Sequence, residues 1–81
     1  MKQLLEFIIK GITAKPEEVI ISESEEEGSL ILKLKVADDD FGTIIGKGGR
    51  TVKALRDVLR LRAQKENIKY NLIIEEPEKP L

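Results

Sequence analysis

The sequence has no cysteine, no histidine and no tryptophan, and aromatic residues make up only 4% of its 81 residues. Cysteine and histidine are the usual ligands of structural zinc, and they supply the thiolate nucleophile and the imidazole base of many enzymes. No hydrophobic run is long enough to cross a membrane, and no apolar signal segment follows Met1. These absences argue against an enzyme, and they predict a cytoplasmic protein without a cofactor, a metal or membrane contact.

The length of 81 residues suits one domain with a single modest core, and it leaves little room beyond a two-layer fold. We expect this domain to span residues 1–76. The last five residues, 77–81, include two prolines and two charged side chains. They carry too little apolar surface to order themselves, so the sequence predicts a disordered C-terminal tail.

The net charge of −1 is unevenly distributed along the chain. Residues 1–41 contain five basic and ten acidic side chains, whereas residues 42–81 contain nine basic and five acidic ones. Residues 47–69 contain eight basic side chains and only two acidic ones, Asp57 and Glu66. A basic face on an acidic protein suits an anionic ligand held in one groove, and a solvated face crossed by salt bridges is the alternative.

The most distinctive stretch is Gly46–Gly49, a glycine-rich turn that follows the apolar pair Ile44 and Ile45 and precedes a basic, helix-forming run. Glycine lacks a Cβ atom, so the main chain can adopt positive φ there and a ligand's backbone can come close. The following helix would direct free amides and the positive end of its dipole at this turn. Because Lys47 and Arg50 add full positive charges, this glycine loop is predicted to bind phosphate groups.

Two other glycine-rich phosphate loops do not fit the sequence. A Walker loop needs four residues between its first glycine and its Gly-Lys pair, whereas Gly42 and Gly46 enclose three, and Gly48 follows the lysine. The dinucleotide-binding fingerprint needs a third glycine where Thr51 stands. The remaining pattern is Gly-x-x-Gly between a short apolar turn and a long helix, and it resembles the loop with which KH domains clamp single-stranded nucleic acid.

Hydrophobic periodicity and turn residues predict an α+β fold with three helices and three strands. Pro16 ends the first helix, and Gly28 permits a tight turn between two strands that pair as a hairpin. The predicted elements are, in chain order, a helix at 2–12, strands at 19–24 and 30–37, a short helix at 41–45, a long helix at 50–65 and a strand at 70–75.

Three consecutive aspartates, Asp38, Asp39 and Asp40, follow the second predicted strand. An aspartate at this place is well suited to cap the short helix at 41–45. An EF-hand needs carboxylates at alternate positions, with a glycine at the sixth position and a glutamate at the twelfth. The contiguous aspartates do not fit that spacing, so we expect helix capping and no metal site.

The long predicted helix sorts into three faces at 100° per residue. Apolar residues that should meet the sheet form the first face: Val52, Leu55, Leu59 and Ala63. Basic residues form a flank: Lys53, Arg56 and Arg60. Apolar residues on the side away from the core form a third stripe: Ala54, Val58 and Leu61. A two-fold axis across this stripe would pair two copies of the chain, so we expect a homodimer, with harmless exposure of the stripe as the alternative.

The predicted order of elements resembles the type II KH arrangement over nearly the whole chain. The segment from Ile44 to Arg56 is similar to that of the KhpA family of small bacterial single-KH proteins. This resemblance implies a two-layer fold of order α-β-β-α-α-β, with a three-stranded sheet packed on three helices. It also implies non-catalytic RNA binding, as an RNA chaperone or post-transcriptional regulator, together with self-association and a larger KH protein of the Jag type as a partner.

The resemblance assigns the glycine loop to the RNA backbone and the preceding isoleucines to the groove wall, and the neighbouring cations extend this site. The candidate RNA-binding residues are Ile44, Ile45, Gly46, Lys47, Gly48, Gly49, Arg50 and Lys53. Gly48 departs from the family, which commonly has a larger polar residue there. With three aromatic residues in the chain, ring stacking is not expected to supply most of the affinity. The alternative is a protein-interaction module whose glycine loop is purely structural.

Overall fold

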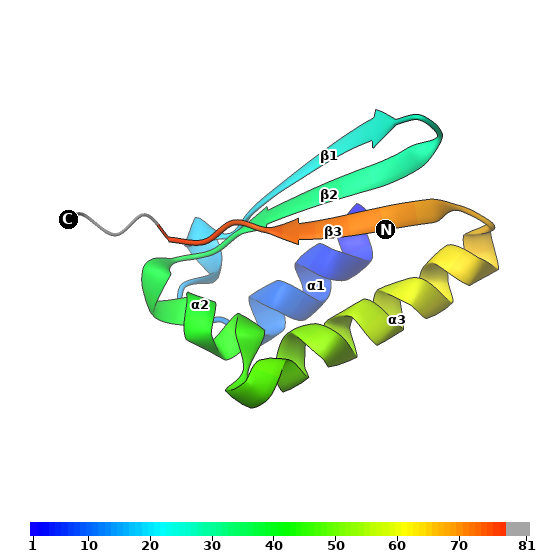
Figure 1. The fold of residues 1–81 in the computed structure, drawn as a ribbon. Coiled ribbons are helices and arrows are strands. Elements are labelled where there is room, and N and C mark those ends of the chain that lie inside the picture. The colour runs from blue at the N-terminus through cyan, green and yellow to red at the C-terminus, as the bar shows by residue number, and fades with distance from the viewer. Residues whose placement is uncertain (78–81) are drawn as a thin grey trace.

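The computed structural model describes residues 1–77, and it consists of a three-stranded sheet with helices packed on one of its faces (Figure 1). Two short 3-10 turns, η1 (Pro16–Glu18) and η2 (Lys47–Gly49), accompany the regular elements. Those elements are α1 (Lys2–Ile12), β1 (Ile20–Glu26), β2 (Ser29–Lys35), α2 (Asp38–Ile45), α3 (Arg50–Glu66) and β3 (Lys69–Ile74). The predicted α+β fold and its order α-β-β-α-α-β are confirmed.

The boundaries differ from the predicted ones by a few residues at most. The short helix α2 is three residues longer at its start than expected, because it begins at Asp38. The tail predicted for residues 77–81 lies outside the described residues except for Pro77, which is half-buried. Residues 75–77 follow β3, and the first of them is bound to the sheet: the amide of Glu75 donates a hydrogen bond to the Leu34 carbonyl over 2.8 Å.

The sheet has the order β1-β2-β3, with β2 in the centre. Strands β1 and β2 pair antiparallel through a tight turn, whereas β2 and β3 are parallel. Parallel neighbours need a long crossover, and here α2, the glycine loop and α3 form it. The crossover therefore returns the chain from one end of the sheet to the other along the helical side of the molecule, and the glycine loop lies within it, between α2 and α3 (Figure 1).

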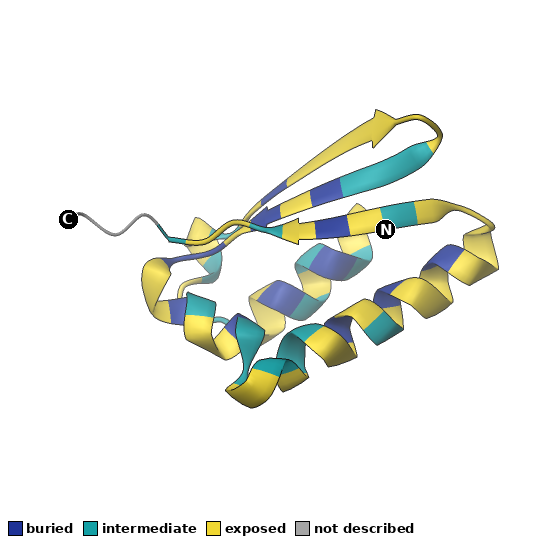
Figure 2. Cartoon of the chain, viewed as in Figure 1, coloured by how far each residue is buried: buried dark blue, intermediate teal, exposed yellow. Residues whose placement is uncertain are grey.

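The core lies between the sheet and the helices, and the helices turn their buried sides towards the sheet (Figure 2). Register places Leu34 of β2 beside Ile21 of β1, and Leu32 beside Leu72 of β3, so alternate residues of the strands meet on the helical face. The largest fully buried side chains are Leu5, Ile9, Leu32, Leu34, Ile44, Leu59 and Leu72. Each such burial stabilises the fold by about 1.5–3 kcal/mol before entropy is counted.

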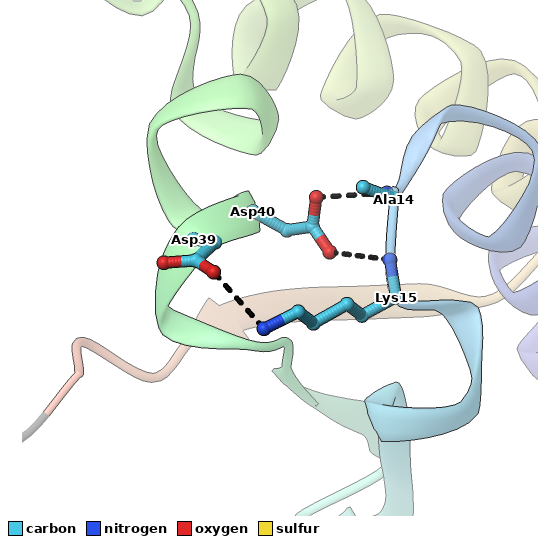
Figure 3. Close-up of polar contacts among 4 residues, drawn as sticks. All are labelled: Ala14, Lys15, Asp39 and Asp40. Atoms are coloured by element: carbon cyan, nitrogen blue, oxygen red, sulfur yellow. Dashed lines mark hydrogen bonds and ion pairs between the residues drawn. The ribbon is translucent and has the colours of Figure 1, made fainter.

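The three aspartates do not cap α2 as expected, because they form its first turn. The N-cap residue is Ala37, and no side chain caps the helix. Asp40 is instead 3% exposed and accepts the amides of Ala14 and Lys15, over 2.8 and 2.9 Å (Figure 3). Its carboxylate satisfies backbone donors in the segment after α1 rather than those of its own helix, which a local sequence pattern could not indicate.

Asp39 also binds across this junction, at the surface (Figure 3). Its carboxylate accepts a hydrogen bond from the Lys15 ammonium over 3.0 Å, and this contact raises the pKa of Lys15 above its ordinary value. Together the two aspartates attach the segment after α1 to the start of α2. The attachment fixes the helix that leads into the glycine loop.

Candidate nucleic-acid interface

The glycine loop begins with Gly46, whose backbone angles of φ 78° and ψ 166° are open essentially to glycine alone. A Cβ atom at this position would lie 2.7 Å from the amide nitrogen of Thr51 and closer still to its hydroxyl oxygen. No real Cβ tolerates such a contact with backbone, so any larger residue would push the first turn of α3 away. Gly46 is therefore required both for its conformation and for its lack of a side chain.

Gly48 and Gly49 have left-handed backbone angles, with φ of 64° and 78°. A Cβ atom at Gly48 would meet nothing within 4 Å, whereas one at Gly49 would come within 3.9 Å of Val52. Gly48 is thus constrained by conformation and not by space, and aspartate or asparagine tolerates its conformation better than most residues. The sequence alone did not reveal that these two positions differ from Gly46.

The amides of the loop are divided between structural bonds and the surface. Gly46 donates to Gly42 over 2.8 Å, Gly49 donates to Gly46 over 3.0 Å, and Arg50 donates to Lys47. Within the described residues, the amides of Lys47 and Gly48 donate to no backbone carbonyl, and both residues are exposed. They lie at the amino end of the 17-residue helix α3, whose dipole adds partial positive charge there.

The cations near the loop fall into a free group and an engaged group. Lys47 and Arg50 are exposed and form no ion pair within residues 1–77. On the basic flank, the Lys53 ammonium lies 3.8 Å from the carboxylate of Asp57, and the Arg60 guanidinium lies 3.4 Å from the same group. The free charges are thus the two that border the loop itself.

Arg56, the third member of the basic flank, is tied to strand β3. Its guanidinium donates to the Leu72 carbonyl over 3.0 Å, and the Tyr70 hydroxyl donates to the Arg56 carbonyl over 2.8 Å. These contacts attach the middle of α3 to the outer edge of the sheet. Sequence periodicity placed Arg56 on a basic face but gave no indication of this structural role.

The apolar residues predicted to line the groove differ in exposure. Ile45 is half-buried and retains surface beside the loop, whereas Ile44 is fully buried. Val52, which was expected to meet the sheet, is also half-buried and lies outside the buried core. Ile44 therefore supports the loop from the core and has no surface for direct contact with a ligand, which corrects its expected place in the groove wall. Burial follows from the tertiary packing of α2 on α1 and α3, and the isoleucine pair alone could not indicate which member turns inward.

The third stripe of α3 is exposed as predicted, since Leu61 is 64% and Val58 is 43% exposed. Its surroundings were not predicted, because α1 lies beside it. Residues from α1 and α3, together with one residue of α2, line an apolar cleft of about 240 Å³: Ile8, Ile9, Ile12, Ile44, Thr51, Ala54, Leu55 and Val58. The apolar surface therefore continues from α3 onto α1, where Ile12 is also 43% exposed.

Membrane spans and metal clusters are both absent from the described part of the chain. No helix within residues 1–77 is long and apolar enough to cross a bilayer. Over the same residues, no three carboxylates stand close enough together to hold a metal ion.

The parallel pairing of β2 and β3, the helical crossover and the glycine loop between its two helices define a KH domain of the type II arrangement. Comparison with known protein families agrees, since a family model described as KhpA/KhpB, KH domain matches residues 2–74. The chain belongs to this family. The family is not enzymatic, which confirms the prediction that the chain is not an enzyme.

Relatives match the chain over most of its length. A protein named RNA-binding protein KhpA from Clostridium acetobutylicum is 54% identical over 67 residues, which cover 83% of this chain and 89% of the relative. Proteins of the same name from Chlamydia trachomatis and Thermotoga maritima are 45% and 48% identical, covering 94% and 73% of this chain and 97% and 79% of the relatives. No solved structure matches the chain.

Proposed function

We propose that this protein binds single-stranded RNA, without catalysis, through the loop Gly46–Gly49. The observation that carries the proposal is the pair of amides at the exposed residues Lys47 and Gly48, beside two cations at the amino end of α3 that form no ion pair within residues 1–77. Helix amino ends with glycine-rich approaches suit phosphate groups. Membership of a family whose relatives are named RNA-binding proteins supports RNA as the source of those phosphates.

The loop residues have different roles in binding. The amides of Lys47 and Gly48, with the side chains of Lys47 and Arg50, contact phosphate oxygens, and Gly46 and Gly49 supply the shape of the loop. Bases lie against the half-buried side chains of Ile45 and Val52, with Ile44 as support beneath. Recognition covers about four nucleotides, as KH loops do. Lys53 adds charge at the edge of the site.

A titration tests the loop directly. The variant carrying Lys47→Asp and Gly48→Asp removes one cation and places two carboxylates against the phosphates, so we expect binding to a short single-stranded RNA to fall beyond detection. The melting temperature should change little, because Lys47 is exposed and aspartate tolerates the left-handed angles at Gly48. Binding equal to that of the parent protein would show that the loop is not the site.

The cellular role that fits such a small clamp is that of an RNA chaperone or post-transcriptional regulator in the cytoplasm. One loop holds few nucleotides, so a single domain binds weakly and exchanges readily. Two loops in one assembly would raise the affinity for a longer RNA through effective concentration. This consideration connects RNA binding with self-association.

The third stripe of α3 supports a homodimer. Ala54, Val58 and Leu61 are exposed, and a two-fold axis across them would bury Leu61 against its own copy while leaving the glycine loop open. The small Ala54 permits close approach of a second helix. The cleft that joins this stripe to α1 extends the surface that a partner can cover. The same face suits a larger KH protein of the Jag type, in keeping with the joint family of KhpA and KhpB.

Sedimentation of the parent protein and of Leu61→Asp at matched concentration tests the dimer. A carboxylate at the axis would face its own copy in a desolvated contact, so we expect a folded monomer, whereas the parent sediments as a dimer at tens of micromolar. A monomeric parent or a dimeric variant would contradict the proposed interface.

An apolar cleft of this kind also favours a second candidate function, a protein-interaction module with a purely structural glycine loop. Such a protein would bind a partner at the cleft and would show no salt-dependent affinity for single-stranded RNA. The RNA titration of the parent protein distinguishes the two functions.

A further inference from the structure

Asp57 is the one acidic residue between Lys47 and Lys65, and it lies in the middle of the basic flank of α3. Lys53 precedes it by one helical turn and Arg60 follows it by nearly one turn, so all three side chains project from the same side of the helix. The two carboxylate oxygens of Asp57 face different cations, with Oδ2 towards Lys53 at 3.8 Å and Oδ1 towards Arg60 at 3.4 Å.

These two contacts are long and exposed. Charge-assisted hydrogen bonds between such groups have lengths of about 2.7–2.9 Å, so neither cation is tightly held. The Lys53 and Arg60 side chains are 80% and 62% exposed, and ion pairs of this kind contribute little to stability. The carboxylate therefore acts on these cations mainly through its negative charge, which lies between them and repels a phosphate that approaches either one.

We infer that Asp57 is a specificity-determining residue, a resident anion that weakens phosphate binding by Lys53 and Arg60 and so favours binding of RNA at the glycine loop. This inference rests on the proposed function. The loop offers contacts to a short single strand, whereas the flank, together with Arg50, offers a row of cations along one side of α3. Such a row suits the continuous phosphate array of a duplex, which needs no loop.

The charges along α3 explain why discrimination depends on this residue. Without Asp57, the flank would present Lys53 and Arg60 as free cations within a few turns of Lys47 and Arg50. A duplex would gain both contacts at once, because its phosphates continue along the helix. A strand of about four nucleotides, held at the loop, has few phosphates left to reach the flank. Asp57 thus lowers the affinity for the duplex more than it lowers the affinity for the short single strand.

The test compares Asp57→Asn with the parent protein, using a single-stranded RNA of about six nucleotides and an RNA duplex of about twenty base pairs as probes. The duplex affinity should rise about 10-fold, and its logarithmic salt slope should become steeper by about 1–2, from one or two added phosphate contacts. The short RNA should gain no more than about 2-fold. Asp57→Glu should restore the parent values for both probes.

Glu66→Gln is the matched control. Glu66 also pairs with a cation one turn earlier, since its carboxylate lies 2.7 Å from Arg62, a contact that lowers the pKa of Glu66. It stands at the carboxyl end of α3, far from the loop. Both amide variants remove one negative charge from an exposed position on α3, with two ion pairs lost at Asp57 and one at Glu66, but only Asp57→Asn should change the duplex affinity.

An unchanged duplex affinity and salt slope in Asp57→Asn would overturn the inference and leave Asp57 as a helix-stabilising partner. An equal gain for both probes, or the same gain in Glu66→Gln, would also overturn it, because either result reflects net charge alone. Failure of the proposed function gives a different pattern. In that case the loop variant with Lys47→Asp and Gly48→Asp binds the short RNA as the parent does.

Discussion

Two exposed turns of this molecule contain glycine at positive φ, and only one of them has the features of a binding site. The hairpin between β1 and β2 turns at Glu27 and Gly28, with φ of 50° and 79°, and the glycine loop turns at Gly46, Gly48 and Gly49. Positive φ and exposure are therefore common to both. They reflect the demands of a tight turn and do not by themselves indicate a ligand.

The two turns differ in the element that comes after them and in their charge. Strand β2 continues from the hairpin, whose two central residues meet the requirement of a tight two-residue turn, and the adjoining side chains are acidic. The glycine loop leads into α3, so the amides of the loop and a helix dipole lie beside two cations that have no ion pair in the described part of the chain. The comparison shows that the helix amino end and the surrounding charge distinguish the candidate site, and the hairpin serves as its internal control.

The largest difference between the two turns should be in the loss of stability when one glycine in each is replaced by alanine. Gly46→Ala forces a Cβ against the Thr51 backbone and into a conformation reserved for glycine, so we expect a loss of about 2–5 kcal/mol in unfolding free energy. Binding to short RNA should be lost with it. Gly28→Ala meets no neighbour and carries only the left-handed strain, about 1–2 kcal/mol.

Denaturant unfolding and an RNA titration of both alanine variants measure this difference. Gly28→Ala should bind RNA as the parent protein does once it is folded. If the two variants lose equal stability, the contact between Gly46 and Thr51 does not constrain the loop. If Gly46→Ala is folded and binds normally, the loop geometry is not needed for RNA binding.

A smaller difference is expected when charge is exchanged at the same two turns. Lys47→Glu reverses an unpaired cation beside the exposed amides, and we expect the dissociation constant for short RNA to rise about 10- to 100-fold. Glu27→Lys makes the opposite exchange at the hairpin, where RNA is not expected to lie, and should change affinity less than about 2-fold. A comparable response from both turns would indicate non-specific attraction of RNA by net charge.

The sequence predicted the fold well, because its hydrophobic pattern is consistent from element to element. Leu30, Leu32 and Leu34 alternate along one strand, and Leu5 and Ile9 share a helical face, so local periodicity and tertiary burial agree. The loop was recognisable because its glycines, its cations and the helix after it are contiguous. Such local patterns need no knowledge of distant contacts.

The features that the sequence did not indicate all depend on contacts between distant segments. Asp40 binds amides 25 and 26 residues away, and Arg56 binds a carbonyl 16 residues away. Neither partner is marked by spacing along the chain. The inward orientation of Ile44, and the cleft that joins Val58 to α1, likewise depend on how the helices pack.

The smallest predicted effect concerns salt, and it measures how many cations bind at the loop. Two to four neutralised phosphates on a single strand give the parent protein a logarithmic salt slope of about −1.4 to −2.8, at about −0.7 for each phosphate. Lys47→Glu should make this slope shallower by about 0.7, since it removes one contact, while Glu27→Lys should leave it unchanged.

The hairpin variant is informative because it raises the net charge by the amount that the loop variant lowers it. If binding depends on net charge, the two variants shift the slope in opposite directions by similar amounts. If it depends on contacts at the loop, only Lys47→Glu shifts it. A flat salt response of the parent would indicate that apolar contact alone holds the RNA, and the two unpaired cations beside the loop would then have no part in binding.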